Sequence, residues 1–531
     1  MGRGVWQVVL RVAAAAVLAA STSVRVAAQG QTIDVPAGGS LQQAINQIQP
    51  GGTIRLVAGA AYVGTFTLPA KNGTDFITIT TRDALLPPAG ARIDPSYKSR
   101  LAIIRSGTTA SAIATASGAS YYRFVGVSFE ANLNGSGDII SLGSASQTLA
   151  QVPHHIEFDR VLIAGHATAG QKRGIAVNAA SIVVMNSDIR NIKTAGQDSQ
   201  AIAGWNGPGP ITIRNNYLEA AGENVMFGGA DVSVPGLVPS DIAIEDNFFT
   251  KSPTWRGMSW TVKNLFELKA ARRVTVRRNI FQYNWGGGQA GFAIVFTPRN
   301  QNGLTPWVVV EDIEFSGNVV AHSGSAFNFL GHDDLFPSGQ LARVVVKNNL
   351  VFDIAGTAWA GNGIFAQLGG EPRDITFDHN TVFHDGNIVT FYSGSYPTTG
   401  GTRVTGGPMS GFVFTNNLLK HNAYGIFGSG QAFGNGSLNF YAPGAVVRRN
   451  VMATDNGAVA ARYPADNLFP PVASFLGMFV DTAGLDYRLQ TGSPYLGAGT
   501  DGANLGCDAA TLMMARAPTA PGGVRLTRTP S

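Results

Sequence analysis

The sequence predicts an all-β fold, a single solenoid of stacked parallel strands that begins with a short capping helix. Three observations predict it. A strand-like pattern recurs about every 33 residues, apolar residues alternate with period two within each copy, and the composition is poor in charge. Charged residues make up 13% of the 531 residues and 66 residues are glycine, whereas about 25% charge is typical of globular domains. This composition is typical of a large β-protein with long turns.

The repeated pattern is an apolar residue, any residue, an apolar residue, two variable residues, Asn, any residue and an apolar residue. It reads ITIRNNYL from Ile211, VTVRRNIF from Val274 and ITFDHNTV from Ile375. The asparagines of the clear copies are Asn216, Asn247, Asn279, Asn318, Asn349, Asn380, Asn417 and Asn450. Apolar residues alternate with period two within the copies, and no amphipathic helix fits in the segments between them. These two observations exclude a helical solenoid.

Each copy therefore predicts one strand of a coil that holds two or three strands. We expect about eleven to thirteen coils, stacked as a single right-handed parallel β-helix. The apolar alternates should face the inside of the coils. The asparagines should sit at turns, where left-handed backbone geometry is tolerated, and their side chains should form a hydrogen-bonded ladder along the axis. Their predicted role is structural.

The N-terminal end of the solenoid carries its cap. Ser40 is the expected N-cap of a helix over residues 41–48, with Gln43 at the capping-box position. The apolar stripe of this helix is Leu41, Ala44, Ile45 and Ile48. Pro50 and the glycines after it end the helix, and a strand over 53–57 follows. Such a helix can plug the open end of the coil stack.

Residues 1–28 predict a secretory signal peptide. They have a basic start, an apolar stretch over 12–20 and small residues up to Ala28. No later segment reaches the roughly 20 apolar residues of a membrane span. We therefore expect a secreted protein, extracellular or periplasmic, with the β-helix over 29–512 and a flexible tail over 513–531.

The charge and cysteine content limit the partners. The net charge is +5, and it falls to about +2 once the signal peptide leaves with Arg3, Arg11 and Arg25. No block of Lys and Arg remains, so no nucleic-acid partner is expected. Cys507 is the only cysteine, so stability must come from the stacked core rather than from disulfides. We expect a monomer.

Two segments resemble a known superfamily. The stretch GGSLQQAINQIQPGGTIRLVAGAAYVGTFTLP resembles the opening of pectate-lyase-like β-helix proteins. The segment DYRLQTGSPYLGAGTDG, from Asp486, resembles the closing segment common in such proteins. The resemblance covers roughly residues 31–508 and implies a polysaccharide ligand. It does not specify a reaction, because the superfamily holds lyases, hydrolases, epimerases and binding proteins.

Candidate site residues lie at the ends of the strands that precede the asparagine strands in mid-chain. They are Asp231, Glu267, Lys269, Arg299, Asn300, His332, Asp333 and Asp334. Stacked coils lie about 4.8 Å apart, so these side chains should line one groove that a linear polymer can cross. The candidate substrate-binding residues are Trp255, Arg256, Asn300 and Asp334.

β-Elimination on a uronic acid needs a cation that neutralises the sugar carboxylate, a base for the C5 proton and a proton for the leaving oxygen. Lys269 is the candidate base, and the planar fork of Arg299 suits a carboxylate. Glu267, Asp231 and Asp333 are candidate ligands for Ca²⁺, which prefers clustered carboxylate oxygens.

This order of residues is similar to that of the chondroitinase-B and alginate-lyase-like β-helix lyases. The resemblance implies that Lys269 is catalytic, that Arg299 follows on the next coil and that Glu267 binds a metal. The chain lacks the second of two alternating acidic ligands before the lysine, and Asn300 stands where the family has His. The segment from Gly331 through His332 to Asp334 resembles polygalacturonase-like hydrolase motifs, which makes His332 a further catalytic candidate.

Three functions therefore remain open from the sequence. They are a polysaccharide lyase, which the order of Lys269 and Arg299 favours, a glycoside hydrolase or epimerase, and a non-catalytic carbohydrate-binding β-helix. A lyase creates an unsaturated sugar that absorbs in the ultraviolet, a hydrolase creates reducing ends without that absorbance, and a binder does neither.

Overall fold

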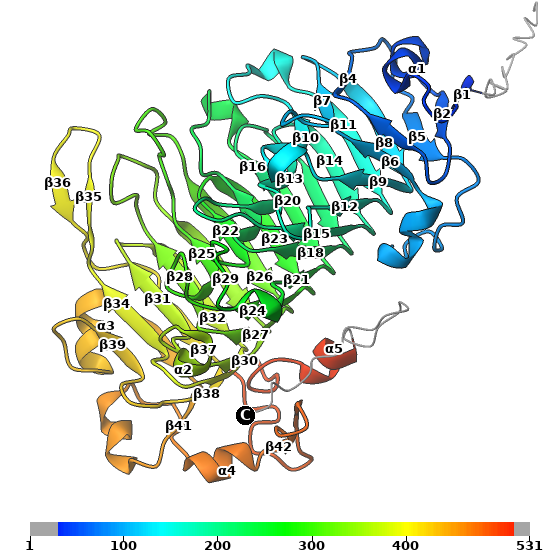
Figure 1. The fold of residues 1–531 in the computed structure, drawn as a ribbon. Helices are drawn as coiled ribbons and strands as arrows, with labels where there is room; N and C mark the ends of the chain where they lie inside the picture. The colour runs from blue at the N-terminus through cyan, green and yellow to red at the C-terminus, as the bar shows by residue number, and fades with distance from the viewer. Residues whose placement is uncertain (1–29, 515–531) are drawn as a thin grey trace, which may run out of the picture.

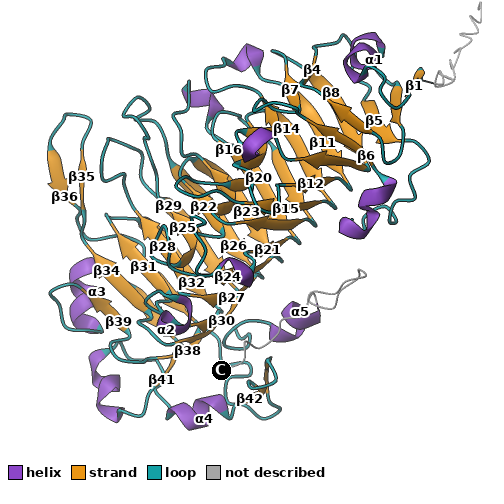
Figure 2. Ribbon diagram, in the orientation of Figure 1, coloured by secondary structure: helices purple, strands orange, loops and turns teal. Residues whose placement is uncertain are grey.

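The computed structural model describes residues 30–514 and confirms the expected right-handed parallel β-helix. Three parallel sheets run along the molecule (Figure 1), with 14 strands in sheet A, 13 in sheet B and 12 in sheet C. Figure 2 shows the helices at the ends of the stack and in the connecting loops. The predicted signal peptide and the predicted tail from residue 515 onward lie outside the described residues.

Each coil places one strand in sheet A, then one in sheet B and one in sheet C. In a central coil these are β17 (Ile211–Arg214), β18 (Tyr217–Ala220) and β19 (Glu223–Phe227). The next coil begins at β20 (Ser240–Glu245), where Ile211 of β17 pairs with Ile242. Successive coils keep this register, so the inward-facing apolar side chains form one continuous core. Loops leave the stack between sheets B and C (B–C loops) and between sheet C and the next sheet A strand (C–A loops).

The asparagine ladder is present at the turn from sheet A to sheet B. Asn318 donates from Nδ2 to Oδ1 of Asn349 at 3.2 Å, and its own Oδ1 accepts from Nδ2 of Asn279 at 3.0 Å. The predicted left-handed geometry is found one residue earlier, as at Arg278 and Asn348. The preceding residue makes the turn, which leaves the ladder asparagine free to point its amide along the axis.

The two ends of the stack are closed differently. At the N-terminal end, α1 (Leu41–Gln47) covers the core, and Oγ of Ser40 accepts from the backbone N–H of Gln43, as expected of an N-cap. At the C-terminal end, side chains of α3 (Asn435–Tyr441) and η6 (Gly457–Arg462) join the core. The elements that follow, α4 (Val472–Leu476), β42 (Phe479–Asp481), β43 (Asp486–Leu489) and α5 (Ala509–Met514), fold back along the stack (Figure 1). Their apolar side chains pack on outward-facing residues of sheet B.

Sheet C positions the candidate site. Its central strands are β10 (Asp138–Leu142), β13 (Arg173–Val177), β16 (Gln200–Gly204), β19, β22 (Phe266–Leu268), β25 (Phe292–Phe296) and β28 (Ser325–Leu330). Its outer face lies between the B–C loops and the C–A loops. Over residues 30–514, no helix is long and apolar enough to cross a membrane.

Candidate functional site: a charged cluster on sheet C

A line of polar contacts runs across the outer face of sheet C from β10 to β19. Nη1 of Arg173 lies 2.6 Å from Oδ1 of Asp138, and Nε of Arg173 donates to Oε1 of Gln200 at 3.0 Å. Nε2 of Gln200 donates in turn to Oε2 of Glu223 at 2.9 Å. All four are the first residues of their strands, so the stacking of coils places them in one column.

The line ends in a cluster of two glutamates and two lysines. Nζ of Lys263 lies 2.7 Å from Oε1 of Glu223, and Nζ of Lys269 lies 3.4 Å from Oε1 of Glu267. A side-chain hydrogen bond joins the two glutamates. The side chains of Glu223 and Glu267 are 0% and 2% exposed, whereas that of Lys269 is 14% exposed. Lys269 is therefore the group of the contacting Glu267–Lys269 pair that solvent can reach.

The two carboxyl groups have opposite pKa shifts. Burial, and then the charge of Glu267, raise the pKa of Glu223. Burial alone would also raise the pKa of Glu267, but the ammonium groups of Lys269 and Lys263 and side-chain hydrogen bonds outweigh it and lower that pKa. Like charges in contact disfavour a second ionisation, so Glu223 takes up a proton before Glu267 as the pH falls.

Two neighbouring B–C loops hold Lys263 in place. The backbone N–H of Thr261 donates to the carbonyl of Thr194 at 2.9 Å, and the N–H of Gly196 donates to Oγ1 of Thr261 at 2.9 Å. Nζ of Lys263 also lies 2.8 Å from Oδ2 of Asp198. The ammonium that contacts Glu223 is thus fixed by a loop two coils earlier in the stack.

The predicted catalytic pair, Lys269 and Arg299, lies on adjacent coils of the same face. The backbone N–H of Arg299 donates to the carbonyl of Lys269 at 2.9 Å. Nη1 of Arg299 lies 2.6 Å from one carboxylate oxygen each of Asp333 and Asp334. Asp333 also accepts from the backbone N–H of Asn300 at 2.7 Å. The structure therefore brings these five predicted residues together.

The three predicted calcium ligands do not fit a calcium site. Asp231 accepts hydrogen bonds from Asn302 and Thr305, while Glu267 and Asp333 are each paired with a basic side chain. Across residues 30–514, no group of three or more His, Cys, Asp or Glu side chains is arranged to hold a metal ion. Calcium needs several clustered oxygens, and these three carboxylates do not supply them.

Trp255 and Arg256, predicted to bind substrate, instead belong to an aromatic cluster on the B–C loops. Trp255 is 4% exposed, and Nζ of Lys193 lies 4.9 Å from the centre of its ring. The guanidinium of Arg256 lies 4.9 Å from the ring centre of Trp359 and donates to the carbonyl of Ala358. These contacts make the two residues part of the packing of the loops, a role that their sequence positions did not indicate.

His332, the third predicted catalytic residue, lies in a C–A loop. Its ring stacks on Tyr396 of β35 (Ser395–Pro397), with 4.1 Å between ring centres. Burial lowers the pKa of His332 below its ordinary value, so the ring is neutral at pH 7. Its neighbour Asp333 is engaged by Arg299 rather than by His332.

Glu223, Lys263 and Asp198 were missed by reasoning from the sequence. A signal for Glu223 exists: aligned by coil, the strands DIISL, RGIAV, QAIAG and ENVMF each have a charged or amide side chain at the first position and are mostly apolar toward their ends. Polar residues that recur at the same strand position in successive coils predict a column of polar side chains along the sheet. Lys263 and Asp198 carry no such signal, because their contact depends on how two loops fold.

The B–C loop over residues 285–291 covers the cluster. Oε1 of Gln289 accepts from Nδ2 of Asn264 at 2.9 Å, and Asn264 donates also to Oε2 of Glu267. The backbone N–H of Gly288 donates to the carbonyl of Val262 at 2.7 Å. A ligand can therefore touch Lys269 and Arg299 from outside, whereas contact with the glutamates requires this loop to open.

Comparisons with known proteins agree in fold type only. No family model and no curated protein matches the sequence. An alginate lyase from Paenibacillus sp. str. FPU-7 has 14% identity and a TM-score of 0.29 over 75% of this chain and 98% of its own. A mannuronic acid specific polysaccharide family 6 lyase from human gut microbiota has 12% identity and a TM-score of 0.45, over 84% and 92%.

The catalytic unit of a GH87 alpha-1,3-glucanase from Streptomyces thermodiastaticus strain HF3-3 has 14% identity and a TM-score of 0.46, over 80% of this chain and 69% of its own. Similarity this low does not extend to activity. The chain is a right-handed parallel β-helix protein whose similarity to polysaccharide lyases and a glucanase is confined to the fold.

Proposed function

We propose that the chain cleaves a uronate-containing polysaccharide by β-elimination at Lys269 and Arg299. One observation carries the proposal. A reachable ammonium, Lys269, contacts a buried carboxylate, Glu267, and a guanidinium, Arg299, stands on the adjacent coil of the same face. In a chain with 13% charged residues, a buried cluster of unlike charges serves no evident packing need.

Lys269 acts on protons in this reaction. As a substrate excludes water, the ion pair with Glu267 becomes costly, and the lysine can pass its proton to the carboxylate 3.4 Å away. The neutral amine then takes the C5 proton, the electrons form the C4–C5 double bond, and the C4–O bond breaks. The resulting ammonium gives this proton to the departing O4, so the lysine serves as base and then as acid. When the product leaves, Glu267 returns the first proton to the lysine and the ion pair re-forms.

Arg299 neutralises the uronate carboxylate, which makes the C5 proton more acidic. Its two carboxylate contacts both use Nη1. Within residues 30–514, neither Nε nor Nη2 of Arg299 makes a hydrogen bond, so both donors are available to a planar acceptor. Asp334, 51% exposed, can yield its place to the substrate at little cost.

A second candidate function is glycoside hydrolysis, and the contact between Glu223 and Glu267 favours it. One carboxyl group with a raised pKa and one with a lowered pKa match the acid and the base that hydrolysis needs. Against it, both side chains are at most 2% exposed, and a pair in direct contact leaves no room for the scissile bond between them. β-Elimination at Lys269 therefore remains the preferred reaction.

One experiment separates the two reactions. Purified protein is incubated with alginate, polygalacturonate and other uronate polymers, and both ultraviolet absorbance and reducing ends are followed. β-Elimination produces both signals, hydrolysis produces reducing ends alone, and a binding protein produces neither. Lys269→Met should abolish turnover, whereas Lys347→Met, which removes an exposed ion pair with Glu314 on sheet A, should leave it unchanged. Full activity of Lys269→Met would contradict the proposed chemistry.

We also propose that the protein is secreted, since residues 1–28 have the pattern of a signal peptide. We propose further that the secreted protein is a monomer. Expression of the full chain in a bacterial host, followed by fractionation and N-terminal sequencing, tests this. Export with cleavage after Ala28 is the expected result, and retention of the uncleaved chain in the cytoplasm would contradict it. Light scattering of the purified chain reports its oligomeric state.

A further inference from the structure

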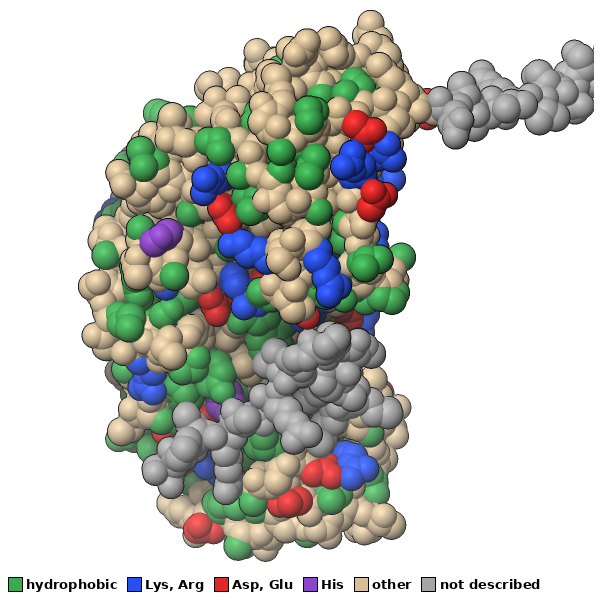
Figure 3. Space-filling model, turned by 45° about the vertical axis from the view of Figure 1, so that its right-hand side comes forward, with side chains coloured by type: hydrophobic (Ala, Val, Ile, Leu, Met, Phe, Trp, Pro, Cys, Tyr) green, Lys and Arg blue, Asp and Glu red, His purple; other side chains and the backbone are tan. Residues whose placement is uncertain are grey.

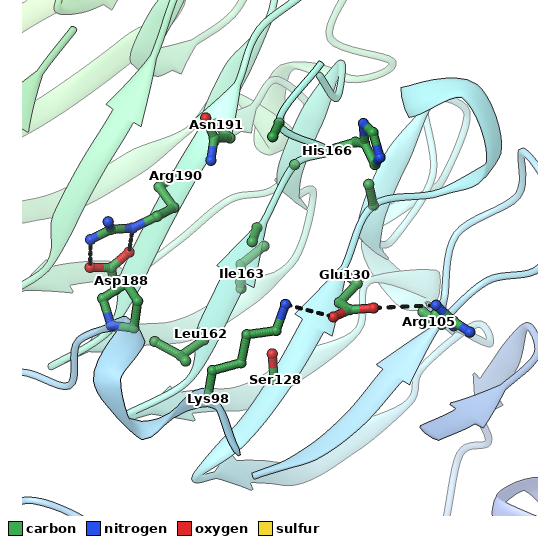
Figure 4. Close-up of a pocket in the computed structure, with 15 residues that line it drawn as sticks. Lys98, Arg105, Ser128, Glu130, Leu162, Ile163, His166, Asp188, Arg190 and Asn191 are labelled. Carbon is green, nitrogen blue, oxygen red and sulfur yellow. Dashed lines mark hydrogen bonds and ion pairs between the residues drawn. The ribbon is translucent and has the colours of Figure 1, made fainter. Parts of the chain in front are cut away.

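A cavity of about 440 Å³ lies on the outer face of sheet B, far along the chain from Lys269 and Arg299. Its floor is formed by β9 (Val127–Glu130), β12 (Leu162–Ala164) and β15 (Asp188–Ile192), and η1 (Pro95–Arg100) lies over one side (Figure 4). Small-molecule sites typically have volumes of about 300–1,000 Å³. In the C-terminal half, the same face of sheet B is covered by α4, β43 and α5.

The cavity joins an apolar floor to an ion pair at each end. Leu162 lies in the middle of the floor, with Ile163 beside it (Figure 4). At one end Nζ of Lys98 lies 2.9 Å from Oε1 of Glu130. At the other end the guanidinium of Arg190 grips both oxygens of Asp188. Small-molecule sites typically combine a mostly apolar surface with a small number of polar groups, as this cavity does.

The polar groups at the rim are held in fixed orientations. Arg190 is clamped between Asp188 and the ring of Tyr217, whose centre lies 4.7 Å from the guanidinium carbon. The side chain of Asp188 is 3% exposed. Nδ1 of His166 accepts from the backbone N–H groups of Thr168 and Ala169, so its Nε2 carries the proton and is a donor. Groups held in this way lose little entropy when a ligand binds.

The balance of charge selects the ligand. A small anion would meet the carboxylates of Glu130 and Asp188, and a small cation would meet Lys98 and Arg190. Lys and Arg side chains also lie beside Asp and Glu side chains on the face of the molecule seen in Figure 3, so the field there is not of one sign. A neutral ligand with many hydroxyl groups avoids both repulsions.

A sugar hydroxyl both donates and accepts a hydrogen bond. One end of the cavity offers the carboxylate of Glu130 beside the ammonium of Lys98, and the other end offers the guanidinium of Arg190, whose side chain is 31% exposed. The apolar face of a pyranose ring matches the floor at Leu162. We infer that this cavity binds a neutral hexopyranose unit of a glycan, as a site separate from the charged cluster on sheet C. The inference does not depend on the reaction proposed for Lys269, because a glycan can be held whether or not the chain cleaves one.

Titration calorimetry of the full chain with maltohexaose, cellohexaose and laminarihexaose tests the inference, with a trigalacturonate as the charged probe. Ala164→Trp fills the cavity from β12 without touching the core, because Ala164 faces outward next to Leu162. Thr212→Trp places the same side chain on the outer face of β17 and serves as the matched control. Lys98→Met removes one half of a partly exposed ion pair.

We expect at least one neutral hexaose to bind, with Kd raised about tenfold or more by Ala164→Trp and by Lys98→Met and unchanged by Thr212→Trp. Lys269→Met should also leave this Kd unchanged, which separates the cavity from the proposed reaction. Two results would overturn the inference: no neutral hexaose binds the wild-type chain, or binding persists in the folded Ala164→Trp variant. Preferential binding of trigalacturonate at the cavity would overturn the assignment of a neutral ligand.

Discussion

Lys263 bridges two carboxylates: its Nζ lies 2.7 Å from Oε1 of Glu223 and 2.8 Å from Oδ2 of Asp198. Glu223 is fully buried on sheet C, whereas the side chain of Asp198 is 43% exposed in the loop before β16. The two contacts therefore differ in energy although they differ little in length. An ion pair with a buried partner leaves an uncompensated charge when it is broken, whereas an exposed pair leaves two solvated groups.

Lys263→Met should lower the free energy of unfolding by about 3–5 kcal/mol, because it removes one of the two cations that neutralise the buried glutamates. Asp198→Asn should lower it by less than about 1 kcal/mol. Urea denaturation of the three proteins at neutral pH measures both values. Equal losses for the two variants would show that the exposed contact, rather than the buried one, holds the loop.

Two isosteric variants test which of the two glutamates is protonated first. The pKa of Glu223 is raised and that of Glu267 is lowered, so Glu223→Gln disturbs the charge of the cluster less than Glu267→Gln does. If Lys269 passes its proton to Glu267, Glu267→Gln should lower kcat by about 10²–10⁴-fold, and Glu223→Gln should have a much smaller effect. The reverse order of effects would place the anion on Glu223. The pH profile of kcat for each variant reports the titrating group.

The repeat and the cap were predictable because each is a local pattern repeated at a fixed spacing. The ladder from Asn216 to Asn450 and the helix after Ser40 could be read from the sequence, and the structure confirms both. The turn geometry was misplaced by one residue, since the pattern does not distinguish the asparagine from the residue before it.

The candidate site was only partly predictable. Lys269 and Arg299 could be placed as neighbours because strand ends stack in register, and their backbones do hydrogen-bond. Lys263 and Trp255 lie in the loop over residues 251–265, and no periodicity fixes how such a loop folds. The sequence does not distinguish a tryptophan that stacks on a sugar from one that packs inside a loop. Trp255 was therefore predicted to contact substrate, although it is buried.

The ladder should contribute strongly to stability. Asn318→Leu removes the acceptor for the backbone N–H of Asn279 and the side-chain donor to the carbonyl of Val276, and it leaves the buried N–H of Asn279 unpaired. Each unsatisfied group costs about 1–3 kcal/mol, so we expect a loss of about 3 kcal/mol or more by urea denaturation. Thr275→Leu, which changes an outward-facing residue of sheet A, should cost far less. A loss for Asn318→Leu no larger than this control would mean that solvent satisfies the ladder.

Removal of divalent cations should leave the protein folded and active. The predicted ligands Asp231, Glu267 and Asp333 are each bound by protein donors, so calcium has no vacant group of carboxylates to enter. We expect the same melting temperature and the same turnover with EDTA as with added Ca²⁺. A calcium-dependent rise in melting temperature would show that these carboxylates exchange their partners for the metal.

Stability should fall in mildly acidic solution because of His384. Burial, and then the charge of Lys420, lower the pKa of His384 from its ordinary value of 6.5 to about 4. The ring is neutral in the folded chain, with Nε2 donating to the carbonyl of Lys420 at 3.1 Å. Between pH 6.5 and 4 the unfolded chain binds a proton at this residue and the folded chain does not. The free energy of unfolding therefore falls as the pH falls through this window, and the contribution is fully present above it.

The difference of about 2.5 pKa units corresponds to about 3 kcal/mol at pH 4. His384→Gln keeps an N–H donor for the carbonyl of Lys420 and cannot titrate, so its unfolding free energy should lose most of this slope between pH 6.5 and 4 relative to the wild type. His166→Gln alters an exposed imidazole and should leave the slope unchanged. Urea denaturation at half-unit pH intervals measures all three proteins. A wild-type slope that survives in His384→Gln would show that His384 is not the group responsible for the acid sensitivity.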